Sequence, residues 1–168
     1  FVSRLNMNIR EDKHWSYGVF STLIEARGQR PFLVVAPVQA DKTKETIEEI
    51  LAEIKSLLTN KPVTSDEYQN ARRSRVNQLP ALWETMAGVE SSLVELVNFN
   101  LPDDYFEKYP ARISSLKIGD LNRAAKQVLH PESLIWVVVG DRSKLEKPLK
   151  ELGLGEIYFL DADGHLIK

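Results

Sequence analysis

The pattern of apolar and polar positions predicts that the chain begins with a helix followed by a hairpin. Apolar residues recur at helical spacing over residues 1–13, so we expect a helix there. Over residues 15–27 the period changes to two, which predicts a long strand. A short turn containing glycine and proline separates this strand from a second apolar run at residues 32–39. Strand, short turn and strand together indicate a β-hairpin.

A block of helices is predicted for the middle of the chain, and strands return near its end. The clearest amphipathic stripe covers residues 43–58. Thr64 and Glu67 form the two ends of a capping box, which predicts the start of another helix. That helix meets Pro80, which must bend or end it because proline offers no amide hydrogen. We further expect helices over residues 82–99, 102–112, 118–129 and 143–152, and strands over residues 134–139 and 157–160.

This order of elements predicts the fold class. Strands that precede a helical block and then resume indicate an α+β fold, in which a mixed or antiparallel sheet is backed by helices on one face. No internal repeat, low-complexity tract or linker interrupts the chain, and 168 residues are the size of one domain. We therefore expect residues 1–168 to form a single domain.

Composition removes several classes of function. A formal charge of -2 argues against nucleic acid as a partner, because no dense basic patch would attract phosphates. No apolar run approaches the roughly 18–20 residues of a membrane span. The chain has no cysteine, which excludes disulfides, thiolate zinc sites and a cysteine nucleophile but leaves the cellular compartment open.

A search for catalytic motifs leaves no catalytic residue and no metal ligand in this chain. The histidines His14, His130 and His165 lie far apart, and none belongs to H-x-x-E-H or H-E-x-x-H, where two imidazoles share a zinc ion. Neither a glycine-rich phosphate loop nor a G-x-S-x-G elbow is present. The segment 161–164 resembles the start of a calcium loop, but it lacks the downstream glutamate, so we interpret it as a turn.

One group of polar residues could contact a substrate. Arg10 lies in the last turn of the first predicted helix and Tyr17 at the start of the first strand, and the chain reverses between them. A guanidinium and a phenol are hydrogen-bond donors that suit a peptide carbonyl or the oxyanion derived from it. In a simpler structural interpretation, Arg10 and Lys13 neutralise the helix C-terminus and Tyr17 packs at a sheet edge. The residue types alone favour this simpler interpretation.

The same segment resembles a motif of the insulinase (pitrilysin-type, inverzincin) zinc metallopeptidases. The motif belongs to their non-catalytic half and reads F-x-S-R-L-x-x-x-(L/I)-R-(E/T)-x-x-x-x-x-Y-(G/S)-V. The matching positions are Phe1, Ser3, Arg4, Leu5, Ile9, Arg10, Glu11, Tyr17, Gly18 and Val19. Weaker matches follow in the same order at Glu67, residues 101–105, residues 137–141 and residues 163–164.

The resemblance implies a peptide hydrolase in which two halves close around a peptide substrate. In such enzymes the zinc and its H-x-x-E-H helix belong to the other half, fused upstream or present as a separate subunit. Arg10 and Tyr17 match the residues that hydrogen-bond the substrate near the scissile bond. The resemblance also implies that this chain is the latter part of an inactive domain, lacking leading strands and inactive by itself. We expect the shortened sheet to expose a strand edge that pairs with another copy or is covered.

Two alternatives remain at this point. The chain is alternatively similar to non-enzymatic core or recognition subunits, in which the same fold serves assembly. The presence of both Arg10 and Tyr17 favours the peptidase half, because a purely structural subunit has no need of the two donors. A general interaction module unrelated to proteolysis is the third possibility.

Overall fold

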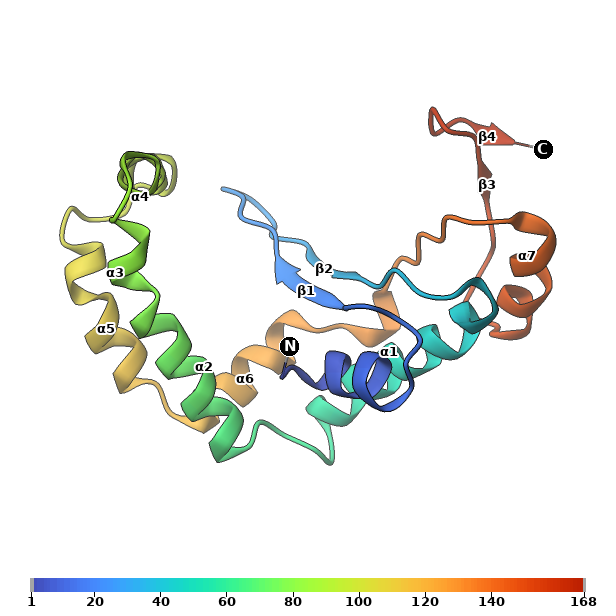
Figure 1. Cartoon of the computed structure of the whole chain (residues 1–168), viewed down its shortest axis with the longest axis horizontal. Coiled ribbons are helices and arrows are strands. Elements are labelled where there is room, and N and C mark those ends of the chain that lie inside the picture. The colour runs from blue at the N-terminus through green and yellow to red at the C-terminus, as the bar shows by residue number, and fades with distance from the viewer. Residues whose placement is uncertain (1, 168) are drawn as a thin grey trace. The chain divides into compact units, whose positions relative to one another are not determined.

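The structure is a computed structural model that describes residues 2–167, and the chain divides into two compact units (Figure 1). The first unit contains the chain up to Phe20, Val34–Glu53 and the chain from Leu134 onward. The second unit contains Ser21–Leu33 and Ile54–Ser133. The helices are η1 (Asn6–Asp12), η2 (Ala40–Lys42), α1 (Thr43–Leu58), α2 (Ser65–Asn77), α3 (Leu79–Leu82), α4 (Met86–Phe99), α5 (Tyr105–Ser115), α6 (Ile118–Val128), η3 (Pro131–Ser133) and α7 (Arg142–Glu151), and the strands are β1 (Phe20–Leu23), β2 (Phe32–Val35), β3 (Phe159–Leu160) and β4 (Leu166–Ile167).

The α+β class is confirmed, but the strands do not form one sheet. Within residues 2–167, β1 pairs with β2 and β3 pairs with β4, giving two separate two-stranded sheets. In the second sheet Phe159 lies opposite Ile167 and Leu160 opposite Leu166, in antiparallel register. The predicted terminal turn joins these two strands. The predicted single sheet is therefore wrong, because the segments that would have joined the two pairs make no ladder.

The first predicted strand is shorter than expected because the Ser16 hydroxyl interrupts it. Its Oγ accepts a hydrogen bond from Gly18 N at 3.0 Å and donates to Pro37 O at 2.6 Å, which kinks the chain. Ser16 forms only an isolated antiparallel bridge with Val38, and regular pairing begins at Phe20. The prediction of a continuous strand over residues 15–27 is wrong for this local reason.

In the first unit, α1 supplies the buried face that its sequence stripe predicted. The buried hydrophobic residues of this unit are Ile9, Val19, Ile47, Ile50 and Leu145. Polar contacts attach η1 to α1, since Asn8 Nδ2 donates to Glu49 Oε2 at 2.7 Å and Lys13 Nζ lies 3.2 Å from Glu49 Oε1. The first unit is thus built around the C-terminal end of η1 and the first turns of α1.

In the second unit, local signals placed most helices correctly. Thr64 caps α2 as predicted, because its Oγ1 accepts from Glu67 N at 3.3 Å while Glu67 Oε2 accepts from Thr64 N at 2.8 Å. Pro80 lies in the first turn of α3, directly after α2 ends. The predicted helix over residues 82–99 is instead interrupted, because Thr85 Oγ1 accepts from Gly88 N at 3.1 Å and starts a new helix, α4.

The apolar run Leu134–Val139 is the main departure from the predicted elements. It was expected to be a strand, but within residues 2–167 it belongs to no sheet. A strand is defined by the neighbour to which its backbone bonds, and no described segment takes that place. The predicted strand over residues 134–139 is therefore not present among residues 2–167, because pairing depends on a neighbour that the local sequence does not specify.

Candidate functional site

Arg10 lies in a short helix of unusual winding. η1 is a π-helix: Lys13 N donates to Asn8 O, five residues earlier, at 3.1 Å. The chain leaves η1 through His14, whose φ of 56° is in the left-handed region that few non-glycine residues adopt. Wide helical turns and strained backbone both occur preferentially at functional sites. The chain reversal predicted between Arg10 and Tyr17 is present, and the left-handed backbone of His14 makes it.

A buried amide attaches the Tyr17 segment to η1. Asn6 is 6% exposed; its Nδ2 donates to Val19 O at 2.7 Å, and its Oδ1 accepts from Val19 N at 2.9 Å. The side chain thus binds the backbone of Val19 as a neighbouring strand would. The sequence analysis did not identify Asn6 as a positioning residue. The available signal was an amide side chain between the apolar residues Leu5 and Met7 of the first predicted helix.

Arg10 and Tyr17 both line one large hollow of the first unit. The hollow has a volume of about 990 Å³. The Tyr17 side chain is 98% exposed, whereas Arg10 is half-buried and pairs with Glu11, with Nη1 and Oε1 3.0 Å apart. Two donors of the predicted type therefore border the same space. Their predicted role towards a substrate stays a prediction.

The remainder of the hollow is mostly apolar. One wall is the segment 136–140, another comprises Val34 and the segment 36–40, and Ile47 and Ile50 of α1 line it as well. Thr46 also lines it and is only 3% exposed, and its Oγ1 has no hydrogen-bond partner among the described residues. A buried hydroxyl without a protein partner is costly, and a water molecule or another polar group in the hollow would satisfy it.

The carboxylate of Glu49 stabilises the base of η1. The hydrogen bond from Asn8 lowers the pKa of Glu49 below its ordinary value, and Lys13 lowers it further, while partial burial acts in the opposite direction. Glu49 is therefore ionised at neutral pH and holds Asn8 of η1 and Lys13, which directly follows η1. This interaction is structural, since it joins η1 to α1.

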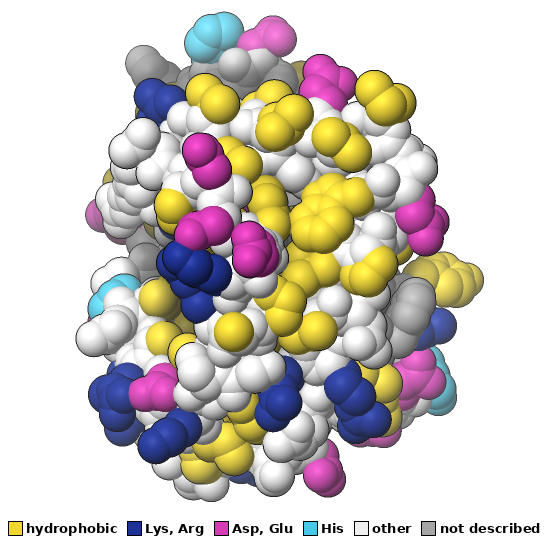
Figure 2. Space-filling model, turned by 90° about the vertical axis from the view of Figure 1, so that its left-hand side faces the viewer, with side chains coloured by type: hydrophobic (Ala, Val, Ile, Leu, Met, Phe, Trp, Pro, Cys, Tyr) yellow, Lys and Arg dark blue, Asp and Glu magenta, His cyan; other side chains and the backbone are white. Residues whose placement is uncertain are grey.

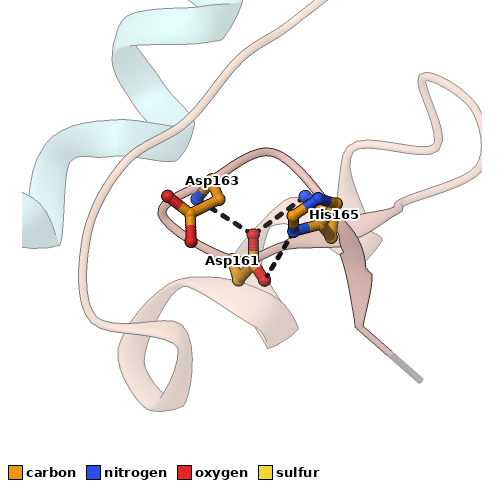
Figure 3. Close-up of side chains that lie close together, drawn as sticks. All are labelled: Asp161, Asp163 and His165. Carbon is orange, nitrogen blue, oxygen red and sulfur yellow. Dashed lines mark hydrogen bonds and ion pairs between the residues drawn. The ribbon is translucent and has the colours of Figure 1, made fainter.

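One group of side chains in the described part of the chain could converge on a cation. Asp161, Asp163 and His165 have ligand atoms within 4.8 Å of one another, and all three are exposed (Figure 3). The Asp161 carboxylate, however, already accepts hydrogen bonds from Asp163 N at 3.0 Å and His165 N at 2.8 Å. These bonds close the turn between β3 and β4, so the group has a structural role.

The second unit carries an apolar surface of its own. Figure 2 shows hydrophobic side chains gathered on the face that carries helices α3 to α5. In α4 the exposed large hydrophobic residues are Met86, Val89, Leu93, Val94 and Val97. No helix of residues 2–167 combines the length and apolar character that crossing a membrane requires.

Comparison with known proteins identifies the first part of the chain. Residues 1–75 match the family model described as the peptidase M16 inactive domain. The match covers this part of the chain, which is somewhat less than half of its 168 residues. The matched range contains Arg10, Tyr17 and the Asn6–Val19 contact, and the prediction of a non-catalytic metallopeptidase domain is confirmed.

A solved structure extends the similarity in fold beyond the matched residues. The chain is similar to the crystal structure of a peptidase M16 inactive domain from Pseudomonas fluorescens, with a TM-score of 0.69 and 22% identity over 77% of the chain. The chain spans 30% of the length of that protein. No curated protein matches the chain. At this identity the likeness shows the fold alone.

Proposed function

We propose that this M16 inactive domain is the substrate-binding, non-catalytic half of a zinc metalloendopeptidase. In this proposal Arg10 and Tyr17 donate hydrogen bonds to the peptide near the scissile bond. The observation that carries the proposal is that both residues lie within the matched residues 1–75 and that both line one hollow. The catalytic partner half, fused or separate, carries the H-x-x-E-H helix.

The chemistry assigned to this chain is binding and charge stabilisation. A zinc ion in the catalytic half would supply Lewis-acid chemistry at the scissile carbonyl. The guanidinium of Arg10 and the phenol of Tyr17 orient the peptide and offer donors to negative charge that develops on its carbonyl oxygen. The exposure of Tyr17 supports this role, because a fully solvated phenol is accessible to a partner that closes over it. The Asn6–Val19 contact limits the movement of the segment that carries Tyr17.

The test is peptide turnover by the complete protein with its catalytic half. Tyr17→Phe removes only a hydroxyl, and Arg10→Ala removes a guanidinium; each should lower kcat about 10²–10³-fold, the usual effect of losing one well-aimed donor. Zinc content and the melting temperature should not change. Tyr158→Phe is the matched control, because Tyr158 is an exposed tyrosine of the same unit that bonds Glu156 instead.

Unchanged turnover in both variants would reject the donor role. The non-enzymatic alternative makes a different prediction. If the fold serves assembly alone, the complete protein hydrolyses no peptide, and Arg10→Ala and Tyr17→Phe assemble as the unchanged protein does.

A further inference from the structure

Tyr17 lies between residues whose backbone is held in place. Its side chain is 98% exposed, so packing among residues 2–167 does not fix the ring. Gly18 and Val19, which follow it, are both buried, and Ser16 before it is half-buried. The backbone is therefore anchored on both sides of Tyr17 while the phenol projects outward. The position of that phenol depends on the contacts of its neighbours along the chain.

The Ser16 hydroxyl makes the first of these contacts. Its Oγ accepts a hydrogen bond from Gly18 N at 3.0 Å, which closes a turn that has Tyr17 at its centre. Its single hydrogen lies within reach of two carbonyl oxygens, Pro37 O at 2.6 Å and Gly18 O at 2.9 Å. Pro37 lines the same hollow as Tyr17. One hydroxyl thus joins the turn that carries the phenol to a wall of the hollow.

The Asn6 amide makes the second contact. It bonds both backbone groups of Val19, at 2.7 and 2.9 Å. Asn6 belongs to η1, and so does Arg10. The segment that carries the phenol is therefore fastened to the helix that carries the guanidinium. Asn6 limits where Tyr17 lies relative to Arg10, and Ser16 limits where it lies relative to the wall at residues 36–40.

Anchoring of this kind matters for a hydrogen-bond donor that acts on developing charge. Such a donor is effective when it is already aimed at the place where the charge appears, because a mobile group must first lose its conformational freedom. A displacement of about 1 Å can lower turnover about 10²-fold. Tyr17 has almost no packing of its own to supply that order. The Ser16 hydroxyl supplies it through the backbone.

The attachment of this segment to the neighbouring wall does not depend on the hydroxyl. Ser16 and Val38 form a backbone bridge, and Gln39 N donates to Trp15 O at 3.0 Å. These backbone contacts remain when the serine side chain is shortened. What the hydroxyl adds is the closed turn around Tyr17. Loss of the hydroxyl should therefore disturb the phenol more than it disturbs the fold.

We infer that Ser16 is a positioning residue for Tyr17: its hydroxyl holds the phenol where it donates to the carbonyl oxygen of a bound peptide. Ser16 acts through Tyr17 and makes no bond to the substrate itself. This inference rests on the proposed function, because it requires that Tyr17 acts on a peptide. It adds the group that places this donor.

The experiment measures steady-state peptide turnover by the complete protein with its catalytic half, at a temperature at which every variant is folded. Ser16→Ala should lower kcat about tenfold, less than Tyr17→Phe does, because the donor is displaced and not removed. KM should change less than about twofold, since a contact to developing charge acts on kcat. Ser115→Ala is the matched control and should turn over like the unchanged protein. Ser115 Oγ also donates to a backbone carbonyl, Arg112 O at 2.7 Å, but it belongs to the second unit.

Ser16→Thr and Ser16→Val form a second pair, which differs by a hydroxyl against a methyl group at nearly equal size. Ser16→Thr keeps the hydroxyl and should turn over within about threefold of the unchanged protein, whereas Ser16→Val should be about tenfold slower than Ser16→Thr. This pair decides the question even if Ser16→Ala alters the fold, because both members carry a branched side chain.

The variant that carries both Ser16→Ala and Tyr17→Phe distinguishes positioning from a merely structural role. If Ser16 acts through Tyr17, Ser16→Ala should change kcat less than about twofold once the phenolic hydroxyl is gone. An equal loss with and without that hydroxyl would overturn the inference and leave the proposed function standing. So would unchanged turnover of Ser16→Ala and Ser16→Val beside a slow Tyr17→Phe. Unchanged turnover of Tyr17→Phe would instead reject the donor role of Tyr17, and this inference with it.

Discussion

The most informative perturbation of this fold is Asn6→Ala, because one side chain serves two buried backbone groups. Asn6 bonds both the N–H and the C=O of Val19, at 2.9 and 2.7 Å, and Val19 is 2% exposed. Alanine leaves both groups without a partner in a place that water does not reach. Each such group costs about 1–3 kcal/mol, so the free energy of unfolding should fall by about 4 kcal/mol.

The assay for this prediction is thermal unfolding followed by circular dichroism. For a chain of this length each kcal/mol corresponds to roughly 2–4 °C, so the melting temperature should fall by about 8–16 °C. Asn70→Ala is the control, since Asn70 is an exposed asparagine whose loss should change stability by less than about 0.5 kcal/mol. A loss below about 1 kcal/mol for Asn6→Ala would refute the reasoning.

Asn6→Asp separates the two bonds. The carboxylate can still accept from Val19 N, but it cannot donate to Val19 O, and the two oxygens repel. Protonation restores a donor, so the pKa of this aspartate in the folded protein should be raised. Its deficit in stability relative to the unchanged chain should therefore shrink as pH falls through that raised pKa. A deficit that is independent of pH would contradict the geometry.

Three further changes test other local features. His14→Gly should raise the free energy of unfolding by about 1 kcal/mol, because a φ of 56° is unfavourable for any residue with a Cβ and is not unfavourable for glycine. A lower melting temperature would contradict this. Because the pKa of Glu49 is lowered in the folded protein, Glu49 stabilises the fold at pH values above its pKa in the unfolded chain, and this stabilisation is lost as pH falls through its pKa in the folded protein. Asn8→Ala should therefore raise the pKa of Glu49 in an NMR titration and make stability depend less on pH in the acid range. Thr64→Ala should cost about 1 kcal/mol in chemical unfolding through loss of the α2 cap, whereas the exposed Thr22→Ala should cost little, and equal effects would reject the capping role.

The candidate site illustrates how far residue types can lead. Arg10 and Tyr17 were identified from the sequence because donors beside a chain reversal suit a peptide carbonyl and because the motif around them resembles a known family. Their common hollow depends on α1 and on residues 136–140, which are distant in sequence. No local pattern contains that information. Asn6 was missed for the same reason, since its partner lies 13 residues away.

The sequence by itself determined the α+β class, the positions of α1, α2, α6 and α7 within a few residues, and the similarity of residues 1–75 to the peptidase M16 inactive domain. These follow from period, caps and a local motif, which act over a few neighbouring residues. Only the tertiary structure decided the π-winding of η1, the kink at Ser16 and the unpaired state of Leu134–Val139. Each of these depends on which backbone groups find a partner across the fold, and a strand-like sequence specifies its own conformation but not its neighbour.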